Sequence, residues 1–283
     1  MNLFDLADQN SDSLKKRCNS LEGRCRTRGS LNEFNNFIKR VISDWRICMN
    51  MRERVLNKVL VSGRYKNIYE VKKDRKEQLT KMGKPSIPRQ EAIKKHLGEH
   101  AEPRIIFDST FEDGNELVYG ALNIGGLGLT GFGPLCVVIK REQAERYSSL
   151  AFIKEDSEKY VVNDRVDLDR LKQDVSNKEH IPLLVALKHE SDIERVRTDK
   201  WSSVICCARG KHDYVYVEAV TKDKILSTHI ETVRMSEENY RVYTQYASED
   251  YESEIDEDNG YRLFILDGII ILLEKLGIEL EVI

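Results

Sequence analysis

The sequence lacks any hydrophobic run long enough to cross a membrane. Its longest apolar run, from Leu263 to Leu273, is interrupted by Asp267 and is far shorter than the ~20 residues that a span requires. The first residues, MNLFDLADQNSD, are acidic where a secretory signal is basic and then apolar. We therefore expect no membrane partner, and either a cytoplasmic location or secretion into a target cell by a route that needs no signal peptide.

Sequence motifs of several enzyme classes are also missing. No CxxC pair occurs, no histidine stands at zinc-ligand spacing from a cysteine, and neither HExxH nor GxSxG is present. The glycine-rich stretch contains no GK[ST] and is not a P-loop, and Val220 occupies the place where a metal nuclease would need lysine after VEA. These absences argue against zinc proteases, serine hydrolases and nucleotide-binding P-loops, and they predict reduced thiols and no metal site.

Charge is distributed unevenly along a chain whose net charge is only −3. Residues 1–104 contain 24 Lys+Arg and 13 Asp+Glu, whereas residues 105–283 contain 21 and 35. Such asymmetry either prepares the basic part for a polyanion or draws the two parts together within one fold. Both interpretations remain open at this point.

Hydrophobic spacing predicts two kinds of structure in succession. Apolar residues recur at three- and four-residue steps from 12 to 60, which predicts one or two amphipathic helices, and a polar loop and a short helix follow over 72–99. From Arg104 onward, seven short segments rich in β-branched and aromatic residues predict five to seven strands: RIIFDST, LVYGALNI, LCVVIK, LAFIK, IPLLVALK, SSVICCA and DYVYVEAV. Further helices are predicted over 164–178, after Ser236 and after Tyr261.

The expected fold class is therefore α+β, with a mainly antiparallel sheet or split barrel behind an N-terminal helical extension. We expect a basic helical extension over 1–60, a catalytic α+β part over 61–240, and an acidic loop with a C-terminal helix or strand over 241–283. The stretch 249–258 has seven acidic residues in ten positions, which indicates either a solvated loop or a decoy for a basic partner.

Three segments carry side chains suited to binding a nucleotide. SGRYKNIYE offers Arg64 to phosphate and Tyr65 to a flat ring, although it also fits a helix end closed by glycine. The stretch that begins FDSTFEDG holds Ser109 and Thr110 at the end of an expected strand, ahead of a glycine-rich hairpin whose backbone can approach a ligand. In DYVYVEAV, alternation places Tyr214, Tyr216 and Glu218 on one face, where Glu218 can stabilise an oxocarbenium-like centre or simply lie on an edge strand.

Taken in order, SGRYKNIYE, YGALNIGG, FGPLCVVIK, AFIKEDSEKY and YVEAV followed by LSTHIETVRM resemble bacterial toxin and effector domains of the ADP-ribosyltransferase superfamily. The resemblance spans roughly residues 61–235. It implies an ADP-ribosyltransferase-like split sheet with NAD as cofactor, and transfer of ADP-ribose to a protein or nucleic acid by a toxin, effector or phage-defence component. It implies Glu218 as the catalytic residue and these NAD-binding residues: Arg64, Tyr65, Asn67, Ser109, Thr110, Tyr119 and Asn123.

Two other functions fit the sequence. The basic N-terminal region, with aromatic residues among its cations, is typical of a nucleic-acid-binding protein or ribonuclease. A non-catalytic interaction protein that holds a partner or inhibitor protein through its helical extension is the third possibility.

Overall fold

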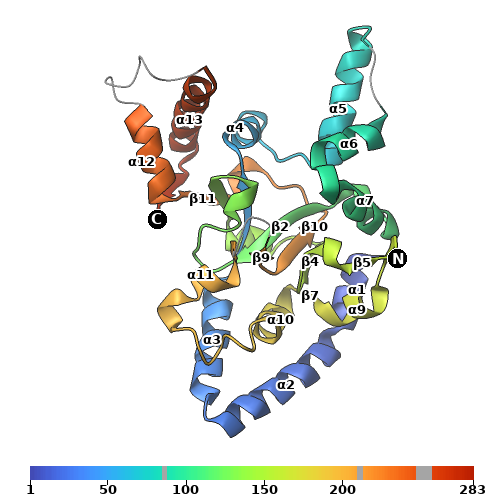
Figure 1. The fold of residues 1–283 in the computed structure, drawn as a ribbon, viewed down its shortest axis with the longest axis vertical. Helices are drawn as coiled ribbons and strands as arrows, with labels where there is room; N and C mark the ends of the chain where they lie inside the picture. Colours follow the sequence, from blue (N-terminus) through green and yellow to red (C-terminus); the bar gives the residue numbers. More distant parts are fainter. Residues whose placement is uncertain (85–87, 209–212, 247–256) are drawn as a thin grey trace.

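The computed structural model describes residues 1–84, 88–208, 213–246 and 257–283, which form a mixed α/β fold around one large sheet (Figure 1). In spatial order the strands of this sheet are β12 (Glu279–Val282), β11 (Ile230–Met235), β3 (Leu135–Ile139), β1 (Arg46–Met51), β2 (Val118–Asn123), β10 (Glu218–Thr221), β4 (Leu150–Ile153) and β7 (Val175–Asn177). All neighbouring strands pair antiparallel except β11 and β12, which are parallel. The expected mainly antiparallel sheet is thus confirmed.

Two short hairpins lie outside this sheet. They are formed by β5 (Val161–Val162) with β6 (Arg165–Val166) and by β8 (Cys207–Ala208) with β9 (Tyr214–Val215). The longer helices are α1 (Leu3–Gln9), α2 (Ser11–Arg28), α3 (Leu31–Asp44), α4 (Glu53–Ser62), α5 (Ile68–Lys81), α6 (Arg89–Leu97), α7 (Ala101–Thr110), α9 (Leu168–Asp174), α10 (Ile181–Lys188), α12 (Glu237–Tyr246) and α13 (Glu257–Leu276). Two four-residue helices, α8 (Arg141–Ala144) and α11 (Ser202–Ile205), complete them.

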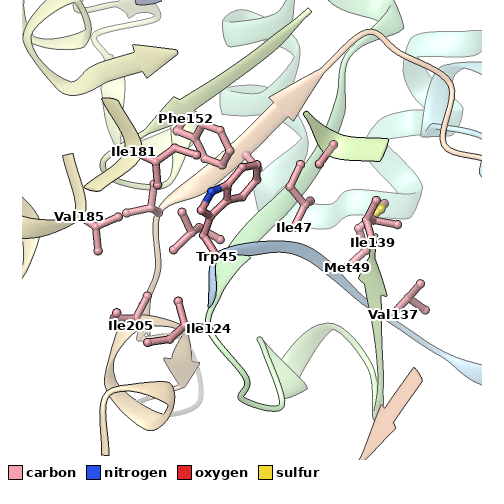
Figure 2. Close-up of a cluster of buried hydrophobic side chains, with 14 of the residues drawn as sticks. Trp45, Ile47, Met49, Ile124, Val137, Ile139, Phe152, Ile181, Val185 and Ile205 are labelled. Carbon is pink, nitrogen blue, oxygen red and sulfur yellow. The ribbon is translucent and has the colours of Figure 1, made fainter. Parts of the chain in front are cut away.

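The main core lies on one face of the sheet, here called the helical face. Alternate residues of β1 and β3, including Ile47, Met49 and Val137, point to this face and meet apolar residues of α2, α3, α4, α10 and α13. Figure 2 shows Trp45 at the centre of this packing, with its ring edge-on to Phe152 at a centroid distance of 6.0 Å. Burial of so much apolar surface supplies most of the favourable free energy of folding.

The opposite face of the sheet, here called the site face, carries two smaller apolar clusters. One joins α1 and α7 to β4 and β10 through residues such as Leu6, Phe107 and Val220. The other lies against β1 and β3 and includes Cys48, Cys136 and Tyr216. Glu218 of β10 pairs with Ala121 of β2, and Tyr119 of β2 pairs with Val220 of β10. Since paired residues of neighbouring strands lie on the same face of a sheet, Glu218 and Tyr119 both belong to the site face.

Several of the sequence expectations for secondary structure are wrong. Residues 46–51, expected to continue a helix, form β1, and the segments 104–110 and 181–188, expected as strands, lie in α7 and α10. Isolated apolar segments of this length fit the periodicity of a helix as well as that of a strand. Their packing within the fold therefore determines which of the two they form. Polar residues from 72 to 81, expected as a loop, belong to α5, whose start is fixed by a capping box between Asn67 and Glu70.

The sheet draws strands from all three parts into which the sequence was divided. β1 comes from residues 1–60 and lies between β3 and β2, so this region is not an extension added to a finished domain. β12 comes from the last part and pairs with β11.

Residues 249–256 of the acidic stretch lie outside the described residues. Within the described part of the chain, none of the helices combines the length and apolar character that crossing a bilayer requires.

Candidate functional site

The site face carries a largely buried group of polar side chains around Glu218, here called the Glu218 cluster. Glu218 is the first residue of β10 and pairs with Ala121 of β2 and Ile153 of β4, so its side chain lies near the middle of the sheet. Only 2% of this residue is exposed. The cluster consists of Tyr69, His100, Arg104, Asp108, Tyr119, Asp156, Ser157, Glu158, Tyr216 and Glu218.

Two groups contact the Glu218 carboxylate directly. The backbone N–H of Ser157 donates to Oε2 at 2.9 Å, and Nη2 of Arg104 lies 3.4 Å from Oε1. Burial raises the pKa of the Glu218 carboxyl to about 8, against the opposing effects of the Arg104 charge and the hydrogen bonding from Ser157. A carboxyl group with such a pKa can take up or release a proton near neutral pH, which is typical of catalytic groups.

Arg104 is the centre of the cluster. Its guanidinium carbon lies 3.6 Å from the centroid of the Tyr119 ring, so cation–π attraction holds the side chain over the ring. Nη1 of Arg104 is buried and has no hydrogen-bond partner among the described residues. A buried guanidinium donor without a partner is uncommon, and an anionic oxygen of a ligand would satisfy it.

Asp108 fastens helix α7 to the sheet. It accepts hydrogen bonds from the hydroxyls of Tyr119 in β2 and Tyr69 in α5, the latter at 2.7 Å. Burial raises the pKa of Asp108, and the Arg104 charge and these two hydrogen bonds oppose the rise. Since Arg104 and Asp108 are four residues apart on α7, they lie on one side of the helix and face the same site.

The acidic side of the cluster comes from the chain that follows β4. Oδ2 of Asp156 accepts from the hydroxyl of Tyr216 at 2.6 Å, and Oε2 of Glu158 lies 2.8 Å from Nδ1 of His100. The hydrogen bond to Glu158 raises the pKa of His100. Four carboxyl groups thus surround one arginine and one exposed histidine, so the cluster favours a positively charged group.

The structure brings together the predicted catalytic residue and some of the residues that were predicted to bind NAD. Tyr119 and Glu218 are both in the cluster, and Tyr65 lies close enough for the Arg104 charge to lower its pKa, although burial dominates and raises it. Arg64 is not a member of the cluster, and its Nη1 is paired at 2.9 Å with Glu70 of α5.

Other predicted residues have structural contacts instead. Asn67 caps α5, and its Nδ2 donates to the carbonyls of Asn115 and Leu117 at 3.0 and 3.2 Å. Asn123 is fully buried and shapes the glycine-rich turn, accepting from the N–H groups of Gly125 and Gly126 at 3.0 and 2.8 Å.

Ser109 and Thr110 do not end a strand as expected. Both lie in the last turn of α7, where their hydroxyls donate to the carbonyl of Ile106 at 3.0 and 2.9 Å. The expectation failed because RIIFDST is too short for its period to separate helix from strand. The spacing of Arg104 and Asp108 was the signal that would have indicated a helix with two charged residues on one side.

Several arginines of the basic N-terminal region are occupied within the fold. Arg17 pairs with Asp174, Arg24 with Glu190, Arg28 with Glu194 and Arg46 with Glu231, at distances from 2.6 to 3.5 Å. Each acidic partner belongs to the acidic part of the chain. These contacts support the interpretation that the charge asymmetry draws the two parts of the chain together.

No protein-family model matches the chain, and a search of the curated proteins finds none with a similar sequence.

Proposed function

We propose that this chain cleaves the nicotinamide N-glycosidic bond of NAD at the Glu218 cluster and transfers ADP-ribose to a macromolecular acceptor. The observation that carries the proposal is the position of Glu218, which is buried on the central sheet between Arg104, the Ser157 backbone N–H and a group of tyrosines. The resemblance to ADP-ribosyltransferases points to the same residue.

The electrostatics of the cluster suit this reaction. Nicotinamide in NAD carries a positive charge, and positive charge develops on the ribose as the glycosidic bond stretches. The carboxyl groups of Glu218, Asp156 and Glu158 would stabilise such charge in a partly buried site, where electrostatic interactions are stronger than in water. A bound cation would also favour the ionised form of Glu218 and lower its pKa.

Arg104 takes, in this proposal, the role that the resemblance implied for Arg64. Its unpartnered Nη1 offers a hydrogen bond to a phosphate oxygen, whereas Arg64 is paired with Glu70.

The bond changes balance without any further reactant. A nucleophilic atom of the acceptor forms a bond to the anomeric carbon of the ribose as the bond from that carbon to the nicotinamide nitrogen breaks. The electron pair of the broken bond passes to the pyridine ring and neutralises its charge, and the acceptor releases its proton to water. Glu218 stabilises the ribose during this exchange.

The test is nicotinamide release from NAD by the purified protein, measured by chromatography with and without cell lysate. We expect Glu218→Gln to lower the rate at least ~100-fold, as loss of a group that stabilises transition-state charge does. The matched control is Asp174→Asn, which changes another buried carboxylate, paired with Lys154 and Arg17 outside the cluster. Equal rates in Glu218→Gln and wild type, or no release by folded wild-type protein in either condition, would contradict the proposal.

A further inference from the structure

Helix α5 differs from the other basic parts of the chain in its packing. None of its residues is buried, and it extends with α6 away from the body of the molecule (Figure 1). The segment 68–84 contains six Lys+Arg and three Asp+Glu. Of those three acidic residues, Glu70 is paired with Arg64 and Asp74 with Lys66. The helix is therefore a positively charged projection.

The cations of α5 are free of the contacts that occupy arginines elsewhere. Lys73, Arg75 and Lys76 are exposed, and none of the three has an ion-pair partner in the part of the chain that the structure describes. We call these three residues the α5 basic face, because at ~100° per residue they fall within one half of the helix circumference. By contrast, four arginines from residues 1–60 are paired with acidic residues from distant parts of the chain.

The α5 basic face is aligned with the Glu218 cluster. Tyr69 lies in the first turn of α5 and bonds Asp108 within the cluster at 2.7 Å. Lys73 and Lys76 are four and seven residues further along, so they continue the side of the helix that Tyr69 begins. Their backbone positions lie about 6 and 10 Å from that of Tyr69, at ~1.5 Å per residue. A chain bound along these lysines would reach the cluster.

The composition of this surface favours a nucleic acid over a protein partner. The exposed residues from 71 to 82 are Val71, Lys73, Arg75, Lys76, Glu77, Gln78, Thr80, Lys81 and Met82, and the two apolar ones are not part of the α5 basic face. Protein interfaces depend on buried aromatic and aliphatic anchors, which the α5 basic face does not offer. Phosphates are instead bound by exposed Lys and Arg, with release of counterions.

We propose that the acceptor of ADP-ribose is a nucleic acid, held by its phosphates along the α5 basic face with its reacting nucleotide at the Glu218 cluster. The choice of acceptor rests on the proposed function, whereas the binding surface itself does not. Arginine and lysine side chains of α5 position the acceptor, and the residues of the Glu218 cluster carry out the transfer.

Binding tests the surface directly. The probe is a fluorescein-labelled single-stranded oligonucleotide of 20 nucleotides, and its anisotropy is followed at 50 and 200 mM salt. We expect Lys73→Gln/Arg75→Gln/Lys76→Gln to bind at least ~10-fold more weakly at the lower salt, with the slope of log affinity against log salt reduced by about 2, since each contact with a single strand contributes about 0.7. Glutamine preserves helix propensity, and circular dichroism verifies folding.

The matched control removes the same charge from exposed lysines elsewhere. Lys15→Gln/Lys16→Gln/Lys39→Gln changes α2 and α3, and we expect it to bind nearly as wild type does. Equal weakening in the two triple variants would reduce the effect to net charge and overturn the inference. Equal affinity of wild type for labelled poly-glutamate would also overturn it and point to an acidic protein.

A transfer assay separates this inference from the proposed function. With NAD labelled in its adenylate phosphate, we expect wild type to label the oligonucleotide and the α5 variant to lose most of that label while still releasing nicotinamide to water. Selective oligonucleotide binding without nicotinamide release would contradict the proposed function and support the binding surface. Full labelling by the α5 variant would overturn the inference while the proposed function stood.

Discussion

Nη2 of Arg104 lies 3.4 Å from Oε1 of Glu218, and the same guanidinium covers the ring of Tyr119. The two charged side chains come from α7 and β10, and both are largely withdrawn from water. Arg104 therefore connects the helix to the sheet at the point where the candidate chemistry is located.

Replacing Arg104 with methionine would leave the Glu218 carboxyl buried without its charged partner. We expect Arg104→Met to lower the free energy of unfolding by about 1–3 kcal/mol at pH 7, through loss of the hydrogen bond to Glu218 and of the contact with the Tyr119 ring, because a Glu218 carboxyl with a pKa of about 8 stays largely protonated. Glu218→Gln in the same chain should recover part of the loss. Urea denaturation of the two single variants and the double variant measures this coupling, and strictly additive effects would show that the two side chains do not interact.

The raised pKa of Glu218 predicts a pH-dependent stability. Folding shifts this pKa from 4.5 to about 8, so the folded chain retains a proton that the unfolded chain releases. The stabilisation is complete below about pH 4.5 and is lost as pH rises to about 8, with a slope of at most ~1.4 kcal/mol per pH unit. Glu218→Gln removes this contribution, so its unfolding free energy relative to wild type should rise between pH 5 and 8. A difference that stays constant across that range would show that Glu218 titrates normally.

Asn67 supports the site by hydrogen bonds to the backbone and not by binding a ligand. Asn67→Ala removes the cap of α5 and the two bonds to the carbonyls of Asn115 and Leu117. We expect a loss of about 1–3 kcal/mol in unfolding free energy. Asn36→Ala, at an exposed position of α3, is the control and should change stability by less than ~0.5 kcal/mol. Similar losses in both variants would disprove the structural role of Asn67.

Ser109 and Thr110 should be dispensable for chemistry. Because both hydroxyls bond to the Ile106 carbonyl within α7, Ser109→Ala and Thr110→Ala should release nicotinamide from NAD at rates within about twofold of wild type, equivalent to about 0.4 kcal/mol. A tenfold lower rate of nicotinamide release in either variant, with unchanged stability, would show that these residues do contribute to the site.

The strands that are rich in β-branched and aromatic residues and bounded by turns could be predicted from the sequence, whereas apolar segments without a clear period could not. LVYGALNI, LCVVIK and LAFIK are strands as expected, since β-branched and aromatic residues dominate them and turns bound them. β1 was mistaken for helix because Ile47 and Met49 continue the apolar spacing of α3. IPLLVALK is apolar on almost every side, so its period carried no information, and only its packing against α2 and α3 makes it a helix.

The candidate site was predicted in part, for similar reasons. Glu218 stood out because a carboxylate among aromatic residues on a strand is unusual, and Tyr216 does share its side of the sheet. Arg104, Asp156 and Glu158 were missed because they approach Glu218 only when α7 and the loop after β4 fold onto β10. Such long-range contacts have no local sequence pattern.

The central place of β1 also constrains how the chain can be built during synthesis. Its neighbours β3 and β2 are translated long after it, and β2 in turn is bordered by β10, which comes later still. A nascent chain therefore holds β1 with both edges unpaired while the ribosome completes the following segments. Late pairing of this kind slows folding and exposes strand edges to other chains, so we expect the growing polypeptide to need chaperone protection until β10 has emerged.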